Sequence, residues 1–149
     1  MLKNLIHKIL GIQTADAHCD IPCGIYLAQP AQTAAETVEK MVEKIQELTP
    51  PNAQEVLSGN AIEAKGKINS MVRYIAVKED HAELCKRELL ILWTDYFKEE
   101  HLQMFPDLHE KFWKAAKLCS ENKREVSLEA AQELRKAVDE IAEMFEKTK

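Results

Sequence analysis

Residues 127–145, SLEAAQELRKAVDEIAEMF, carry the clearest helical pattern in the chain and decide its fold class. Ser127 directly precedes the apolar stripe, and a serine hydroxyl is a favourable cap for the first turn of a helix. The segment therefore predicts an amphipathic helix with one buried face. The apolar side chains that share this face recur at steps of three and four residues: Leu128, Ala131, Leu134, Val138, Ile141 and Phe145.

The same spacing occurs upstream, first in residues 34–48 and again in residues 68–97. The first stripe ends before residues 50–51, Pro-Pro, because proline cannot continue the hydrogen-bond ladder of a helix. The second stripe is interrupted by the polar residues 78–81, Lys-Glu-Asp-His, where we expect either a break or a functional face.

Shorter signals complete the pattern. Asn52 predicts a cap for a short helix that runs through Leu57, and residues 58–60, Ser-Gly-Asn, are typical of a turn. Pro106 suits the first turn of a further helix, whose apolar stripe reaches Cys119. Because the connections are short and no strand pattern occurs, we predict an all-α fold, an antiparallel four-helix bundle preceded by an N-terminal metal-binding hook.

Length and composition narrow the class of protein. A chain of 149 residues, 46% of them hydrophobic, is long enough to bury the core of a single domain. The net charge of −5 and the lack of a basic stripe argue against a nucleic-acid partner. No apolar run has the length of a membrane span, so we expect no membrane partner either.

The first 17 residues, MLKNLIHKILGIQTADA, are predicted to be a removable pro-segment. Residues 15–17, Ala-Asp-Ala, have the A-x-A form of a peptidase cleavage site. His7 and Lys8 interrupt the apolar stretch, which makes it a poor export signal. We therefore expect cleavage by a maturation peptidase and a cytoplasmic protein, with secretion as the alternative. Residues 18–149 then form the single helical domain.

The hook, residues 18–26, reads HCDIPCGIY and concentrates the metal chemistry of the chain. Cleavage before His18 would free an amine that forms chelate rings with the backbone nitrogen and thiolate of Cys19. The Cys23 thiolate can complete a planar set of two nitrogens and two sulfurs, which favours Ni(II) or Cu(II), whereas zinc prefers tetrahedral sites. The His18 imidazole can add an axial ligand.

Thiolates and a deprotonated amide stabilise a higher oxidation state, so this donor set suits a Ni(III)/Ni(II) couple. A backbone amidate is costly without metal, and the site should form only after cleavage and metal binding. Pro22 and Gly24 shape the hook, since glycine adopts backbone angles that other residues resist. By contrast, Cys85 and Cys119 lie on apolar helical faces and are expected to be buried hydrophobic residues.

The hook resembles that of the nickel-containing superoxide dismutases, which begin H-C-D-x-P-C-G-x-Y after removal of a pro-segment. A second block with the family pattern, LWTDYFK, spans residues 92–98. The resemblance covers most of residues 18–112, but it is weakest at residues 50–68, where this chain is longer, and in the last helix. Further residues that match the family are Pro30, Ala31, Gln32, Glu36, His101, Pro106, Leu108 and His109.

This resemblance implies a homohexamer of four-helix bundles that disproportionates superoxide to dioxygen and hydrogen peroxide, with one nickel ion per mature chain. His18 would supply its amine and an axial imidazole, Cys19 its thiolate and amide nitrogen, and Cys23 the second thiolate. Tyr26 would stand over the open face of the metal and restrict access to it.

Residues around the ligands are also implied by the resemblance: Asp20, Glu36, His81 and Tyr96. Glu36 would orient the His18 imidazole, as carboxylates often do for ligating histidines. His81 stands where the family pattern has an arginine, so we expect weaker, pH-dependent support of that imidazole. Tyr96 would lie near Tyr26.

Charges and histidines nearby are assigned simpler roles. Lys98 would attract the superoxide anion to an acidic chain. His101 and His109 are expected to be surface residues in a loop and at a helix start.

Two other functions fit the hook. The chain could be a non-catalytic protein that binds or delivers nickel or copper, or a helical interaction module in which Cys19 and Cys23 form a disulfide.

Overall fold

The computed structural model describes residues 24–57 and 61–149. The predicted pro-segment, residues 18–23 with the predicted ligands His18, Cys19 and Cys23, and the expected turn at residues 58–60 lie outside this part. Within it, no strand occurs. The chain forms helices α2 (Gln29–Glu47), α3 (Ala53–Leu57), α4 (Ala61–Ile91), α5 (Leu108–Arg124) and α6 (Leu128–Glu146), with a π-helical turn η1 (Leu92–Tyr96) and a 3₁₀ helix η2 (Glu99–Gln103) between α4 and α5.

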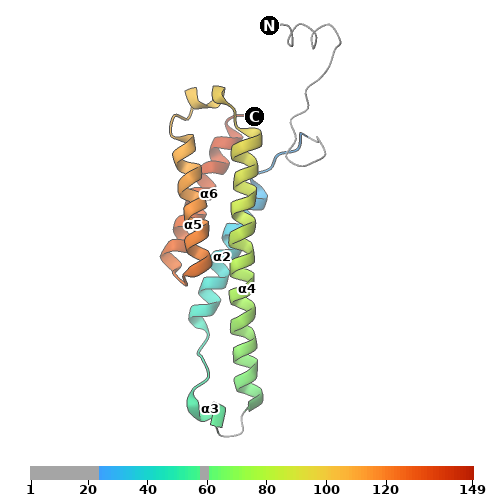
Figure 1. Cartoon of the computed structure of the whole chain (residues 1–149), viewed down its shortest axis with the longest axis vertical. Helices are drawn as coiled ribbons and strands as arrows, with labels where there is room; N and C mark the ends of the chain where they lie inside the picture. Colours follow the sequence, from blue (N-terminus) through green and yellow to red (C-terminus); the bar gives the residue numbers. More distant parts are fainter. Residues whose placement is uncertain (1–23, 58–60) are drawn as a thin grey trace.

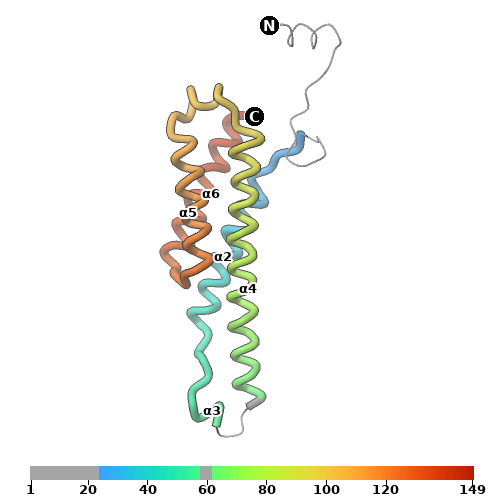
Figure 2. The backbone as a smooth tube through the Cα atoms, viewed as in Figure 1, coloured from blue at the N-terminus to red at the C-terminus, as the bar shows by residue number. Residues whose placement is uncertain are grey.

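The long helices form an antiparallel bundle (Figure 1). Helix α2 packs against α4 and α6, and α5 packs against the same two helices, so the four close around one core. The predicted all-α antiparallel four-helix bundle is confirmed. The tube in Figure 2 shows that α5 and α6 flank only part of α4, which continues past them towards α3. No helix of the described residues is long and apolar enough to cross a membrane.

The core is built from the predicted stripes. On α6, Leu134, Val138 and Phe145 are each at most 1% exposed. The Ser127 hydroxyl accepts a hydrogen bond from the backbone N–H of Ala130 at 3.2 Å, which confirms the predicted cap. Burial of one face thus fixes the helix that the sequence marks most clearly.

Of the two possibilities for residues 78–81, a break or a functional face, the break is wrong, because α4 runs through them without interruption. Lys78 is only 1% exposed, and its ammonium group donates to the backbone carbonyls of Asn122, Lys123 and Glu125. These carbonyls lie at the end of α5, where a helix leaves acceptors without intrahelical partners. Lys78 therefore caps α5 from the neighbouring helix, and burial lowers the pKa of its amine.

A second correction concerns the start of α4. Ile68 and Val72, which belong to the predicted stripe, are 49% and 59% exposed. The pattern is helical, as expected, but α5 and α6 do not extend along this part of α4 (Figure 1). The apolar face consequently lacks a second layer there.

The ends of the shorter segments follow local rules. The Asn52 side chain accepts from the N–H of Glu55 at 2.8 Å, and the Glu55 carboxylate accepts from the N–H of Asn52 at 3.2 Å. This reciprocal pair confirms the predicted short helix. Helix α5 begins at Leu108, two residues later than Pro106 suggests, with Asp107 at its N-cap position.

Cys85 and Cys119 are buried between α4 and α5, as predicted. The hydrogen bond between the Cys85 and Cys119 thiols and the burial of Cys85 both raise the pKa of Cys85. A protonated, buried thiol is a poor ligand and nucleophile, so this cysteine belongs to the core.

Candidate functional site

The described chain begins at Gly24, directly after the predicted ligand Cys23. Gly24 has a φ of +65°, a left-handed conformation that glycine adopts without strain. The chain then passes through Tyr26 and enters α2 at Gln29. The backbone freedom expected of Gly24 is therefore used.

Tyr26 packs on the far end of the bundle. Its hydroxyl donates to the backbone carbonyl of Asp95 at 3.4 Å, and its ring lies 5.4 Å from that of Tyr96 at an angle of 56°. The structure thus brings together two of the predicted site residues, Tyr26 from the hook and Tyr96 from the second block, residues 92–98. The hydrogen bond of Tyr26 goes to the backbone beside Tyr96.

A π-helical turn presents these groups. The N–H of Phe97 donates to the carbonyl of Leu92 at 3.0 Å, one residue further back than in an α-helix. The Thr94 hydroxyl donates to the carbonyl of Leu90 at 2.7 Å, an alternative bond of the kind that bends helices. Such π-turns are frequent at functional sites. Here the widened turn carries both Asp95 and Tyr96.

The end of α6 fixes Tyr96. The Thr148 hydroxyl donates to the carbonyl of Phe145 at 2.7 Å, so its single hydrogen is already used. The Tyr96 hydroxyl, 2.9 Å away, must therefore be the donor to Thr148. The rings of Phe97 and Phe145 pack edge-on against Tyr96 at 5.2 and 4.6 Å. Position and proton direction of this phenol are both determined.

Around the two tyrosines lies a cavity of about 380 Å³. Its wall begins at Gly24, one peptide bond after the predicted ligand Cys23. Polar and aromatic groups dominate it, so it suits a small polar molecule. The lining residues are Gly24, Tyr26, Asp95, Tyr96, Lys98, Glu100, His101 and Thr148.

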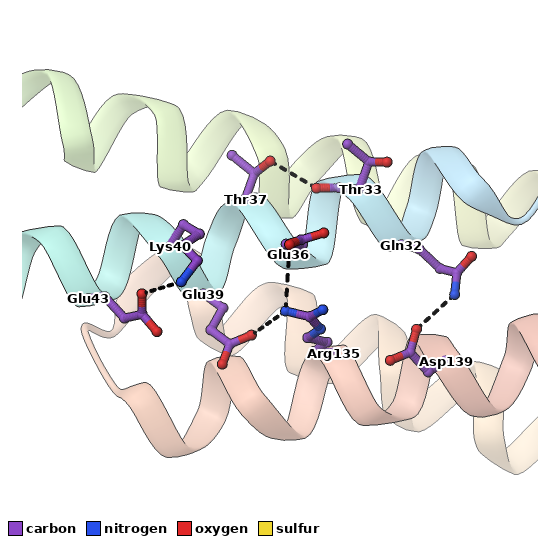
Figure 3. Close-up of polar contacts among 9 residues, drawn as sticks. All are labelled: Gln32, Thr33, Glu36, Thr37, Glu39, Lys40, Glu43, Arg135 and Asp139. Atoms are coloured by element: carbon purple, nitrogen blue, oxygen red, sulfur yellow. Dashed lines mark hydrogen bonds and ion pairs between the residues drawn. The ribbon is translucent and has the colours of Figure 1, made fainter.

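Glu36 lies elsewhere, on the face of α2 that meets α6 (Figure 3). Its carboxylate is 3.9 Å from the guanidinium of Arg135. Arg135 has a closer partner in Glu39, at 3.0 Å, and this hydrogen bond raises the pKa of the arginine. Gln32 and Asp139 form a further bridge between the same helices at 2.8 Å. The predicted role of Glu36, to orient the His18 imidazole, stays a prediction.

His81 lies in the middle of α4. Its Nδ1 is 2.9 Å from the carbonyl of Val77, and because a carbonyl only accepts, the ring donates from Nδ1. Neither this contact nor that of Glu36 involves the tyrosine pair. His18 lies outside the described residues, so the predicted support of its imidazole by Glu36 and His81 stays a prediction.

The expectation for His101 needs revision. Its side chain is only 17% exposed, and its ring stacks on Tyr96 at 5.9 Å. It is a wall of the cavity, a role that the sequence analysis missed because stacking depends on the fold. His109 is exposed at the start of α5, as expected, and its Nδ1 accepts from the indole of Trp93 at 2.8 Å.

The predicted ligands His18, Cys19 and Cys23, with Asp20 beside them, lie outside the described residues. Among residues 24–57 and 61–149, no group of three or more His, Cys, Asp or Glu side chains is arranged to hold a metal. The ligand set therefore stays a prediction.

Comparison with known proteins connects the cavity with a family. A family model for nickel-containing superoxide dismutase matches residues 13–149, which include the whole hook. The chain belongs to the nickel-containing superoxide dismutase family. It is 32% identical over 133 residues to Superoxide dismutase [Ni] of Streptomyces seoulensis, covering 89% of this chain and 88% of that one. It is 31% identical over 136 residues to Superoxide dismutase [Ni] of Streptomyces coelicolor, covering 91% of each.

Solved structures of nickel superoxide dismutase share the fold. The native enzyme superposes with a TM-score of 0.72 at 29% identity, covering 88% of this chain and 98% of that one. A structure with the nickel ligation of the oxidised state gives a TM-score of 0.69 at 30% identity, covering 88% and 97%. Family membership, predicted from the hook and the second block, is confirmed.

Proposed function

We propose that this chain, after cleavage before His18, is a nickel-dependent superoxide dismutase. Two superoxide anions and two protons become one dioxygen and one hydrogen peroxide. The observation that carries the proposal is the tyrosine-walled cavity, which begins one residue after the ligand motif in a chain of this family.

The donor set fits nickel. His18 would contribute its freed amine and imidazole, Cys19 its thiolate and backbone nitrogen, and Cys23 its thiolate. Soft thiolates and planar nitrogen donors favour nickel over zinc. When bound, nickel supplies a one-electron Ni(III)/Ni(II) couple. Each mature chain holds its own ion.

Residues of the bundle control access. Tyr26 and Tyr96 narrow the cavity, and both phenols are held by hydrogen bonds to protein oxygens. Lys98 places a positive charge at the same cavity, which favours a small anion in an otherwise acidic chain. The tyrosines thus select by size and the lysine by charge.

Asp20 lies within the ligand loop. Glu36 and His81 support the His18 imidazole from α2 and α4.

Maturation completes the site. A peptidase cleaves between Ala17 and His18, and the processed chain acts in the cytoplasm as a homohexamer. The interruption of the leader by His7 and Lys8 supports an intracellular pro-segment over an export signal.

The test compares chains that begin at His18 and are loaded with nickel. Wild type should contain nickel, show a rhombic Ni(III) spin-resonance signal and dismutate superoxide. Cys19→Ser and Cys23→Ser should lose activity and keep their helix content. Cys119→Ala removes a core thiol instead and should remain active.

Other outcomes separate the alternatives. A chain that binds nickel without dismutation is a binding or delivery protein, and full activity in either hook variant refutes the ligand assignment. The unprocessed chain should be inactive, because a peptide bond occupies the His18 nitrogen.

A further inference from the structure

His101 has a fixed direction of hydrogen bonding. Its Nδ1 lies 3.1 Å from the backbone N–H of Lys98, which can only donate. Nδ1 must therefore accept, and in the neutral ring the hydrogen is on Nε2. The parallel face of Tyr96 and the edge of Phe97, at 5.5 Å, hold the ring in place.

The Nε2–H has no close acceptor among the described residues. The carboxylate oxygen nearest to it, on Glu100, is 4.0 Å away, beyond hydrogen-bond length, and the Glu100 side chain is 72% exposed. Both residues line the cavity, together with Lys98. The neutral N–H donor of His101 and the ammonium group of Lys98 therefore belong to residues that line the same cavity.

Three other groups at this cavity, Asp95, Tyr26 and Tyr96, have contacts of their own among the described residues. One oxygen of the Asp95 carboxylate lies 2.9 Å from the Thr94 hydroxyl, whose hydrogen is donated to the carbonyl of Leu90. Tyr26 donates to a backbone carbonyl and Tyr96 to Thr148. Glu100 is thus the carboxylate that competes most directly for the histidine donor.

From these contacts we propose that His101 and Lys98 form a binding subsite for a small monoanion, with the His101 Nε2–H as its fixed neutral donor. The proposal rests on the proposed function, in which that anion is superoxide on its way to the metal. His101 is a positioning residue of this outer site and transfers no proton, because protonation at Nδ1 would break its bond with Lys98.

Two substitutions separate the donor from the structural role. In His101→Asn the amide oxygen can take the place of Nδ1 and keep the bond from Lys98, but no donor reaches the Nε2 position. In His101→Gln the longer amide can restore a donor there, and glutamine is favoured at this place in a helix start. His109→Asn is the matched control, since its Nδ1 also accepts a hydrogen bond.

The first measurement is azide binding to the metal-free chain from His18, followed by the NMR signals of ¹⁵N-labelled histidine. We expect the Nε2–H form of His101 and a shift of its signals with azide. His101→Asn should bind azide about tenfold more weakly, as expected for a lost bond to a charged partner. The azide affinity of His101→Gln and His109→Asn should stay within about twofold of wild type, because both variants keep a donor at the subsite.

A variant that is expected to bind azide more tightly excludes misfolding as the cause of the weaker binding. Glu100→Gln removes the competing carboxylate from an exposed position and should bind azide about threefold more tightly, a change of well under one order of magnitude. Equal azide affinity in wild type, His101→Asn and Glu100→Gln would overturn the subsite, as would an Nδ1–H tautomer.

The second measurement is steady-state dismutation by the nickel-loaded chain. His101→Asn should raise KM about tenfold with little change in kcat, because the lost contact binds the substrate without taking part in the chemistry. An unchanged KM would overturn the subsite and leave the proposed function intact. If wild type binds azide through His101 but shows no dismutation, the proposed function fails and the anion site stands.

Discussion

The larger part of the helical region, built by four helices, and a smaller part, built by two, are stabilised in different ways. We call residues 48–57 and 61–75 the arm, which comprises α3 and the start of α4, and the rest of the helical region the bundle. In the arm, Ala64 is the one described apolar side chain that is buried. Five of its large apolar residues are 49–89% exposed: Val56, Leu57, Ile62, Ile68 and Val72.

Local contacts maintain the arm. The reciprocal cap of Asn52 and Glu55 starts α3, and the Lys67 ammonium group binds both oxygens of Glu55 at 2.9 and 3.1 Å. In the bundle, burial of apolar side chains supplies most of the stability. The residues that line the cavity of the candidate site belong to the end of the bundle opposite to α3 (Figure 1). We therefore expect that substitutions in the arm have little effect on the candidate site.

The largest effect is expected from a substitution that creates a cavity in the bundle core. Phe112 is 1% exposed and stacks on Trp93 at 5.6 Å. Phe112→Ala should lower the free energy of unfolding by about 4 kcal/mol, measured by urea denaturation. Ile62→Ala in the arm removes a side chain that is 89% exposed and should change it by less than about 0.5 kcal/mol. Similar losses at both positions would contradict the division.

The next largest effect concerns the buried lysine. Lys78→Met removes the donor for three carbonyls at the end of α5 and should cost about 2 kcal/mol in urea denaturation at neutral pH. Lys65→Met, at an exposed position of the arm on the same helix, should be close to neutral.

The pH dependence of that variant has a definite sign. Burial lowers the pKa of Lys78 in the folded state below its ordinary value of 10.5. In the interval below 10.5 the unfolded chain therefore binds more protons, and the stability of wild type should rise with pH relative to Lys78→Met. A constant difference between the two proteins would show that the lysine is not desolvated.

A smaller effect is expected where the bundle meets the cavity. Thr148→Val leaves the Tyr96 hydroxyl without its acceptor and should cost about 1 kcal/mol in thermal denaturation. Thr148→Ser keeps a hydroxyl and should retain most of the stability. Equal losses in both variants would mean that the methyl group, and not the hydrogen bond, stabilises this contact.

The smallest effect tests the arm itself. The hydrogen bond from Lys67 lowers the pKa of Glu55 below its ordinary 4.5, so the pair contributes above that pH and is lost as pH falls through the lowered value. Glu55→Gln should accelerate amide hydrogen exchange in α3 about threefold at neutral pH, without a change in global unfolding.

At acid pH that difference should vanish, because wild type loses the same charge. Glu133→Gln on α6 serves as the control and should leave exchange in α3 unchanged. A global loss of stability in Glu55→Gln would show that arm and bundle unfold as one unit.

The sequence predicts most of the fold because helical period and burial coincide in the bundle, as for Leu134 and Val138. Ile68 and Val72 follow the same period and are exposed, since the reach of α5 and α6 is a property of the assembled chain. Lys78 suggested a break because polarity alone cannot reveal carbonyls more than 40 residues away.

The candidate site divides in the same manner. The ligand set His18, Cys19 and Cys23 could be proposed from the sequence alone because these residues are neighbours in it, and it stays a prediction. The role of His101 could not, because it depends on stacking against Tyr96 and on which ring nitrogen faces Lys98. Residue spacing carries no information on tautomers.

The hydrogen bond between Tyr96 and Thr148 has a consequence for the timing of biosynthesis. Residues 24–26 leave the ribosome early, yet the wall on which Tyr26 rests is held in place by a residue near the end of the described chain. A nascent chain therefore cannot complete the cavity until translation has passed Thr148. Products truncated before Thr148 would lack the acceptor of the Tyr96 hydroxyl, so the wall beside Tyr26 would be held less firmly.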